Sequence, residues 1–177
     1  FGNVASKVED PSDLDLYKTF IDGQFDPTVT WDDIAWLRQQ WKGKLIIKGV
    51  MEADDARAAV DCGAEGIIIS NHGGRQLDGI SSSIAKLPSV ATAVNKQCAL
   101  LIDSGIRNGI DVVKSIALGA DAVLMGRPWV YAMAAHGEQG VVDLMQMVNK
   151  EIEIAMALMG VNRIDEINSD LIDKDLW

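Results

Sequence analysis

The stretch Gly66–Asp78, GIIISNHGGRQLD, decides the fold because it runs from an apolar strand into a loop rich in glycine and polar residues. Its three consecutive isoleucines, with no alternation of apolar and polar residues, are typical of a strand covered on both faces. Similar apolar runs predict three further strands, at Lys44–Gly49, Cys98–Asp103 and Ala122–Gly126. Together these runs favour a parallel sheet covered by helices.

A helix is predicted after each of these strands, so the chain contains four strand–helix units. Their helices are predicted at Glu52–Cys62, Ser81–Asn95 with a break at Pro88, Asn108–Leu118 and Pro128–Ala135. The flanking helices are predicted at Asp13–Phe20, Trp31–Trp41, Val141–Met159 and Arg163–Leu171. This alternation indicates the α/β class.

Four such units fit two architectures. One is a small doubly wound sheet. The other is a (β/α)8 TIM barrel, which takes about 250 residues, so that this chain would carry roughly the last four βα units. The chain has 177 residues and begins with Phe1 rather than Met, and we therefore expect a processed or truncated product of one domain.

The composition excludes several classes of protein. With 16 basic and 26 acidic residues the net charge is −10, which argues against a nucleic-acid-binding protein. No uncharged apolar run approaches the roughly 18 residues that a membrane-spanning helix needs. Cys62 and Cys98 are far apart, so we expect a reducing, cytoplasmic compartment. Two histidines and two distant cysteines have no ligand spacing, so no metal site is predicted.

A basic residue lies at or just after the end of every predicted strand. These residues are Lys48, Arg75, Arg107 and Arg127. Because the carboxyl ends of parallel strands share one face, we expect the four cations to form one rim around an anion, although four unrelated surface charges are the alternative.

The last two strand ends indicate where a phosphate would bind. Gly105 lies near Arg107, and Gly126 precedes Arg127, in each case just before a helix. Glycine lets backbone N–H groups approach an anion, and a helix N-terminus favours negative charge. The alternative is that both glycines only form tight turns. Asp103 either accepts a hydrogen bond from a ligand hydroxyl or caps the turn.

The loop after the second strand carries the candidate for proton transfer. His72 lies three residues before Arg75, so an imidazole base and a guanidinium that grips a carboxylate are close together. A purely structural histidine is the alternative for His72, and His136 is interpreted as a helix cap. Lys48 is a candidate Schiff-base nucleophile, a fixed cation beside a cofactor, or a lysine that only reaches out to water.

Four stretches resemble the FMN-dependent α-hydroxy-acid oxidases and dehydrogenases. They are Leu45–Gly49 (LIIKG), Ser70–Asp78 (SNHGGRQLD), Leu101–Gly109 (LIDSGIRNG) and Leu118–Pro128 (LGADAVLMGRP). SNHGGRQLD is highly specific, and the other three are moderately so. Within the family, LIDSGIRNGIDVV and LDGISSS are most similar to the bacterial quinone-linked L-lactate dehydrogenases.

The resemblance implies a (β/α)8 barrel with FMN at the carboxyl ends of its strands. It implies oxidation of an L-2-hydroxy acid, L-lactate to pyruvate, with His72 as the base and Arg75 binding the substrate carboxylate. It implies that Lys48 lies beside the flavin ring. The implied cofactor-binding residues are Lys48, Ser70, Asp103, Ser104, Gly105, Arg107, Gly126 and Arg127.

The chain departs from the family because the first four strands are absent. We therefore expect the C-terminal half of a barrel, with a mobile loop region at 1–30, βα units at 31–136 and C-terminal helices at 137–177. The expected partners are the missing N-terminal half, the hydroxy acid and further copies in a homo-oligomer, with no nucleic acid. The resemblance also implies a peripheral position on the inner membrane.

Two alternatives to the hydroxy-acid dehydrogenase remain open. The first is an isolated half-barrel that binds the FMN phosphate without turnover. The second is another phosphate-binding barrel enzyme that uses Lys48 as a Schiff base, although SNHGGRQLD argues against it.

Overall fold

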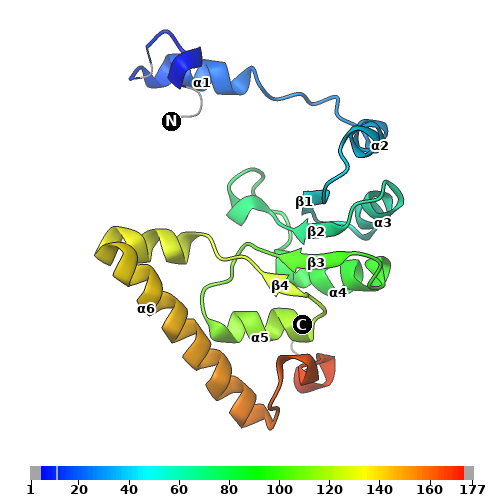
Figure 1. Cartoon of the computed structure of the whole chain (residues 1–177), viewed down its shortest axis with the longest axis vertical. Helices are drawn as coiled ribbons and strands as arrows, with labels where there is room; N and C mark the ends of the chain where they lie inside the picture. The colour runs from blue at the N-terminus through cyan, green and yellow to red at the C-terminus, as the bar shows by residue number, and fades with distance from the viewer. Residues whose placement is uncertain (1–4, 11, 174–177) are drawn as a thin grey trace.

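The computed structural model describes residues 5–10 and 12–173, and at its centre is a parallel sheet of four strands (Figure 1). The strands are β1 (Ile46–Val50), β2 (Gly66–Ile69), β3 (Ala99–Ile102) and β4 (Ala122–Val123). Their order in the sheet is β1-β2-β3-β4, so the chain always winds in the same direction. A doubly wound sheet reverses its direction at a switch point, whereas a barrel does not. The observed order is therefore that of half a barrel.

A helix covers the sheet after each of the first three strands, and a longer one follows the fourth. These helices are α3 (Ala53–Asp61), α4 (Ser83–Val94), α5 (Gly109–Ala117) and α6 (Arg127–Met159). The helices before the sheet are α1 (Leu14–Asp22) and α2 (Trp31–Gln40). The short 3₁₀ helices are η1 (Ala5–Lys7), η2 (His72–Gly74), η3 (Ile164–Glu166) and η4 (Ser169–Leu171). Each predicted βα unit is thus present.

The main core lies between the sheet and helices α3 and α4. Ile67 and Ile69 of β2 are completely buried, and they pack with Leu87 and Val90 of α4. A second cluster joins α5 to the end of α6 and to the residues that follow it. The apolar strand runs of the sequence therefore supply the core, as a sheet covered on one side by helices requires.

Three predicted elements differ from the structure. Helix α4 continues through Pro88, because the proline removes only one hydrogen bond and the buried Leu87 and Val90 hold the helix on both sides. Strand β4 ends at Val123, since the chain then turns towards α6. The short helix predicted at Arg163–Leu171 is instead two separate 3₁₀ turns.

Helix α6 joins two helices that the sequence predicts separately. Backbone geometry is non-helical at His136 and Gly137, where Gly137 has a φ of 58°. Only glycine adopts this conformation without strain, so the axis bends there. The expected end of a helix at His136 therefore appears as a kink.

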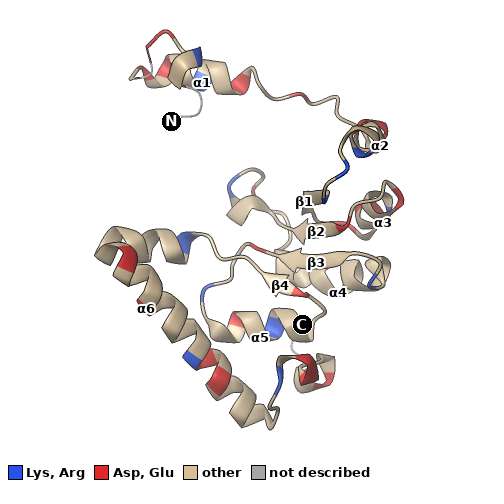
Figure 2. Cartoon of the chain, in the orientation of Figure 1, with Lys and Arg blue, Asp and Glu red and all other residues tan. Residues whose placement is uncertain are grey.

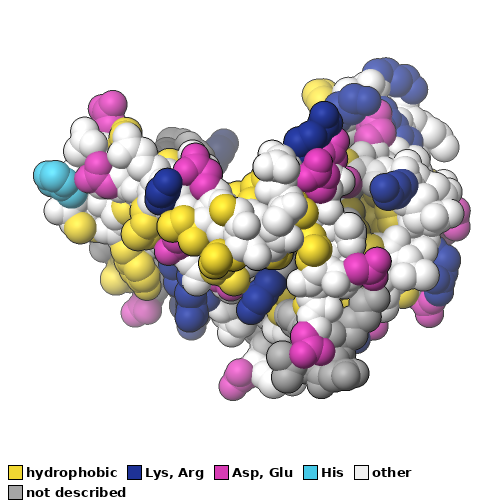
Figure 3. Space-filling model, turned by 90° about the horizontal axis from the view of Figure 1, so that it is seen from below, with side chains coloured by type: hydrophobic (Ala, Val, Ile, Leu, Met, Phe, Trp, Pro, Cys, Tyr) yellow, Lys and Arg dark blue, Asp and Glu magenta, His cyan; other side chains and the backbone are white. Residues whose placement is uncertain are grey.

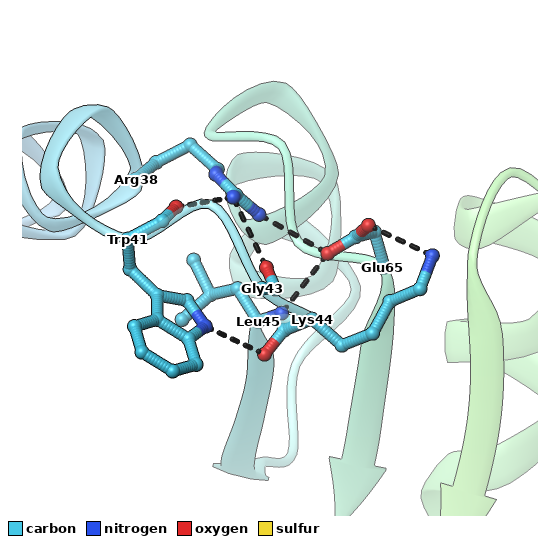
Figure 4. A network of polar contacts seen from close by, with 6 residues as sticks. All are labelled: Arg38, Trp41, Gly43, Lys44, Leu45 and Glu65. Atoms are coloured by element: carbon cyan, nitrogen blue, oxygen red, sulfur yellow. Dashed lines mark hydrogen bonds and ion pairs between the residues drawn. The ribbon is translucent and has the colours of Figure 1, made fainter.

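A polar network at the amino end of the sheet attaches α2 to the strands (Figure 4). The carboxylate of Glu65 accepts hydrogen bonds from Arg38 Nη1 at 3.1 Å, Lys44 Nζ at 3.0 Å and the backbone N–H of Leu45 at 2.9 Å. The hydrogen bond from Leu45, followed by that from Lys44 and by the charges of Lys44 and Arg38, lowers the pKa of Glu65. This network joins α2 and the residues just before β1 to Glu65, which directly precedes β2.

The outer edges of the sheet and several apolar side chains stay uncovered within the described residues. Neither β1 nor β4 has a second strand partner there, and Ile46 of β1 is 50% exposed. Figure 3 shows apolar side chains gathered across the middle of the face seen from below. No helix in the described part of the chain is long and apolar enough to cross a bilayer.

Candidate active site

A cavity of about 600 Å³ lies at the carboxyl ends of the strands. Lys48 of β1 and the segments that follow β2, β3 and β4 contribute to its wall. Figure 2 shows Lys and Arg residues on the loops at the arrowhead ends of the strands. Lys48, Arg75, Arg107 and Arg127 all line this one cavity. The strand-end cations are therefore gathered at a single site and not scattered over the surface.

Lys48 and Asp103 form the charged centre of the cavity. Lys48 Nζ lies 2.8 Å from Asp103 Oδ2 and donates a hydrogen bond to Ser70 Oγ at 2.9 Å. Burial by itself raises the pKa of Asp103, but hydrogen bonds from Lys48, Ser70 and Ser104 and the charge of Lys48 outweigh it, so the pKa is lowered. Asp103 is therefore an anion that holds Lys48 at the carboxyl end of the sheet.

Two serines connect this ion pair to the loop that carries His72. Ser70 Oγ accepts a hydrogen bond from the backbone N–H of His72 at 3.1 Å. Ser104 Oγ donates to Asp103 Oδ1 at 2.7 Å and accepts from the backbone N–H of Gly73 at 3.0 Å. The backbone of the loop after β2 is thus tied to the end of β3.

Two non-glycine residues of the site have left-handed backbones. His72 has a φ of 56° and Ser104 a φ of 69°. Such a conformation costs a non-glycine residue about 1 kcal/mol or more, and it persists where surrounding contacts hold it. Residues of this kind concentrate at functional sites. Both lie in the segments that line the cavity.

The loops after β3 and β4 provide room for an anion. At Gly105 and Gly126 an added Cβ would meet no heavy atom within 4 Å, so the backbone of both faces open space. Arg127 begins α6, whose first N–H groups have no partner within the helix. Arg127 Nη2 also donates to the carbonyl of Gly73 at 3.3 Å. Backbone, helix end and guanidinium together suit a phosphate ester.

Arg75 and His72 lie on the same short segment. His72 begins the 3₁₀ helix η2 and Arg75 follows its end, and both residues are exposed and line the cavity. The other histidine, His136, lies at the kink of α6 and does not line the cavity. Within the cavity, His72 is therefore the imidazole available for proton transfer.

Two contributors to the site were not singled out from the sequence. Gly49 forms a bulge in β1 with a φ of 99°, and an added Cβ would lie 3.3 Å from His72 Cε1. A glycine inside an apolar strand is a signal for such a close approach. Trp129 is 43% exposed and lines the cavity with Tyr131. Its place in the first turn after a strand end was the available signal.

A one-directional parallel sheet with a cationic cavity at its carboxyl ends defines a phosphate-binding β/α-barrel protein, of which this chain carries four units. The chain belongs to the FMN-dependent dehydrogenase family, whose pattern it matches over residues 3–174. FMN is the cofactor of this family.

The sequences of two bacterial relatives support the same family. The chain is 49% identical over 174 residues to an L-lactate dehydrogenase of Alcaligenes faecalis, covering 98% of this chain and 46% of the relative. It is also 49% identical over 175 residues to an L-lactate dehydrogenase of Pseudomonas aeruginosa strain LESB58, covering 99% and 46%. The chain thus spans about half the length of these relatives.

Solved structures agree on the fold. The monotopic membrane protein (S)-mandelate dehydrogenase superposes with a TM-score of 0.85 at 38% identity, covering 92% of this chain and 43% of that chain. A flavocytochrome b2 variant with pyruvate bound gives a TM-score of 0.80 at 38% identity, covering 84% and 40%. The predicted TIM-barrel class is therefore confirmed.

Proposed function

We propose that this chain is the C-terminal half of an enzyme that oxidises an L-2-hydroxy acid, L-lactate to pyruvate, with FMN as the electron acceptor. One observation carries the proposal: His72, Arg75 and Lys48 come from two different strand ends and line one cavity with the anion-binding loops. The L-lactate dehydrogenases at 49% identity support the choice of acid.

The cavity has groups suited to each part of FMN. Arg107, Arg127 and the open backbone at Gly105 and Gly126 would hold the phosphate. Asp103 would accept from a ribityl hydroxyl, and Lys48 would lie beside the ring. When bound, FMN supplies the two-electron redox chemistry that no side chain of this chain can perform.

The side chains then have separate roles in the proposal. Arg75 grips the substrate carboxylate and so fixes the orientation of the acid. His72 takes up a proton of the substrate at an imidazole nitrogen, and the two electrons of the oxidation would pass to FMN. Ser70 contributes by accepting the N–H of His72 and a hydrogen bond from Lys48. Trp129 and Tyr131 add aromatic side chains to one wall of the cavity.

The second candidate function is a half-barrel that binds the FMN phosphate without turnover. It is favoured by the two sheet edges that have no partner strand among the described residues. A Schiff-base enzyme is disfavoured, because that chemistry needs a neutral amine whereas Lys48 Nζ contacts the Asp103 carboxylate at 2.8 Å.

An anaerobic visible spectrum tests the proposal. The purified chain is mixed with FMN, alone and together with the N-terminal half from a relative, and L-lactate is added. Bleaching of the flavin band supports hydroxy-acid oxidation. A flavin that binds yet stays oxidised in both mixtures favours the half-barrel without turnover. D-lactate serves as the matched control and should leave the flavin oxidised.

The remaining expectations are part of the same proposal. The proposed division is a loop region at 1–30 that contains helix α1, βα units at 31–136 and C-terminal helices at 137–177, of which residues 1–4, 11 and 174–177 lie outside the described part of the chain. The complete enzyme forms a homo-oligomer, which size-exclusion chromatography with light scattering would test. It lies in the cytoplasm at the face of the inner membrane, as the monotopic (S)-mandelate dehydrogenase suggests, and cell fractionation would test this.

A further inference from the structure

Ser104 occupies a backbone conformation that favours glycine. Its φ is 69°, and its neighbour Gly105 already provides a glycine in this turn. Serine gains nothing from this conformation by itself, so surrounding contacts must offset the strain. Ser83 Oγ donates to the backbone carbonyls of Asp103 at 2.5 Å and Ser104 at 2.9 Å, and the side chain of Ser104 adds contacts of its own. The hydroxyl makes two contacts, donating its proton to Asp103 Oδ1 and accepting the N–H of Gly73. It therefore bridges the end of β3 to the loop after β2.

A second serine holds the preceding peptide of that loop. Ser70 is 1% exposed, and its hydroxyl accepts the N–H of His72. The two consecutive N–H groups of His72 and Gly73 are therefore both bound by serine hydroxyls. Both serines also hydrogen-bond to the same carboxylate, that of Asp103. The left-handed turn at His72 is thus fixed on both sides of the residue.

Fixing this turn also fixes the imidazole. The ring approaches the bulge of β1 so closely that an added Cβ at Gly49 would lie 3.3 Å from His72 Cε1. We propose that Ser104 is a positioning residue, whose hydroxyl holds the His72–Gly73 turn and thereby keeps the imidazole against Gly49. The proposal rests on the proposed function for the role of His72, and it assigns Ser104 more than a contact to the cofactor.

Three variants of the full chain separate the effect of the Ser104 hydroxyl from the effect of the strained backbone. Ser104→Gly removes the hydroxyl and relieves the positive φ, whereas Ser104→Ala removes the hydroxyl and keeps the strain. Asn95→Gly is the matched control, because Asn95 also has a positive φ, of 46°, but lies at the end of α4 away from the cavity. NMR of the chain without FMN measures the amide exchange of Gly73 and the proximity of His72 Hε1 to the Gly49 Hα protons.

We expect exchange at Gly73 to be about five-fold faster in both Ser104 variants, as the loss of one hydrogen bond implies. The contact between His72 and Gly49 should weaken in both of them. Asn95→Gly should change neither signal. The thermal midpoint of Ser104→Gly should not fall, because glycine relieves the strained backbone.

Three outcomes would overturn the proposal. The first is unchanged exchange and contact in both Ser104 variants. The second is an effect in Ser104→Ala alone, which would assign the role to strain. The third is a loss of FMN affinity with unchanged Gly73 exchange, which would make Ser104 a cofactor contact only. A flavin that L-lactate fails to reduce would instead contradict the proposed function, since the exchange measurement uses neither substrate nor FMN.

Discussion

Glu65 and Asp103 lie at opposite ends of the same sheet, and each carboxylate joins neighbouring segments. Glu65 comes just before β2 and holds Arg38, Lys44 and the N–H of Leu45. Asp103 follows β3 and holds Lys48 and, through Ser104, the backbone of the loop that carries His72. Both carboxyl groups have lowered pKa values. The side chain of Glu65 is 40% exposed, whereas that of Asp103 is 18% exposed.

The difference shows how a β/α barrel separates stability from chemistry. At the amino end, Glu65 contacts groups of α2 and of the segment before β1, and these groups do not line the cavity. At the carboxyl end, Asp103, Lys48 and Ser104 line a cavity together with His72 and Arg75. Residues at the carboxyl ends of barrel strands carry catalysis, and those at the amino ends carry stability. Substitutions at the two ends should therefore have different readouts.

The largest effect is expected for His72→Asn. Loss of the imidazole base should slow anaerobic reduction of the flavin by L-lactate by about 10²–10⁴-fold, measured by stopped-flow absorbance in the mixture that turns over. Binding of FMN should persist, because the loops after β3 and β4 are unchanged. Arg38→Gln at the amino-end network and His136→Asn at the kink of α6 are the controls, and both should keep the rate. An unchanged rate in His72→Asn would contradict the assignment of His72 as the base.

The second effect is expected for Arg75→Lys. Lysine keeps the charge but loses the planar fork that binds a carboxylate through two parallel hydrogen bonds. The KM for L-lactate should rise by about 10- to 100-fold, while kcat changes less. Steady-state kinetics measure both constants. Arg57→Lys is the matched control, because Arg57 pairs with Asp54 on the exposed surface of α3. A similar rise in KM for Arg57→Lys would remove the special role of Arg75.

Much of this contrast could be predicted from local sequence. Apolar runs such as Ile67–Ile69 identify the strands, and the side chains just after each run identify the carboxyl-end site. The prediction that Lys48, Arg75 and the two later arginines lie together is confirmed, because all four line one cavity. It could be made from the sequence because the carboxyl ends of parallel strands share one face. Such inferences need only the chain direction and the order of the elements.

The rest depends on contacts between distant residues or on backbone angles. The amino-end network pairs Arg38 with Glu65, 27 positions apart, and nothing local marks that pair. The left-handed φ of Ser104 could not be predicted from the sequence, because serine does not indicate that conformation as glycine does. Helix α4 passes through Pro88 because tertiary burial of Leu87 and Val90 outweighs a local signal.

A third prediction compares the two carboxylates directly. Asp103→Asn leaves Lys48 without its anion and weakens the contacts of Ser104, so the affinity for FMN should fall by about ten-fold. Glu65→Gln should leave that affinity unchanged and lower the thermal midpoint by a few degrees at most. Titration of the chain with FMN, followed by flavin fluorescence, measures the affinity. Equal losses of affinity in both variants would contradict the separation of the two ends.

The smallest effect concerns acid stability. The pKa of Asp103 is lowered from 3.8 and that of Glu65 from 4.5. Each carboxylate therefore stabilises the fold at pH values above its ordinary pKa. This stabilisation is lost as the pH falls through the lowered pKa, because the unfolded chain then binds the proton more readily. Asp103→Asn and Glu65→Gln should therefore each flatten the dependence of unfolding free energy on pH in acid, with the Glu65 contribution starting to decline at the higher pH. Urea unfolding at pH values from about 2 to 7 measures it.

Salt distinguishes the two contributions. The Debye length shrinks to about 3 Å at 1 M salt, so the exposed pairs of Glu65 with Arg38 and Lys44 are screened. Asp103 is shielded from solvent and keeps its hydrogen bonds, so its share of the acid transition should survive. In 1 M NaCl the difference between Glu65→Gln and the unsubstituted chain should thus shrink without vanishing, because the hydrogen bond from the N–H of Leu45 persists, while the effect of Asp103→Asn should keep its size. Equal sensitivity of both variants to salt would mean that burial does not distinguish the two carboxylates.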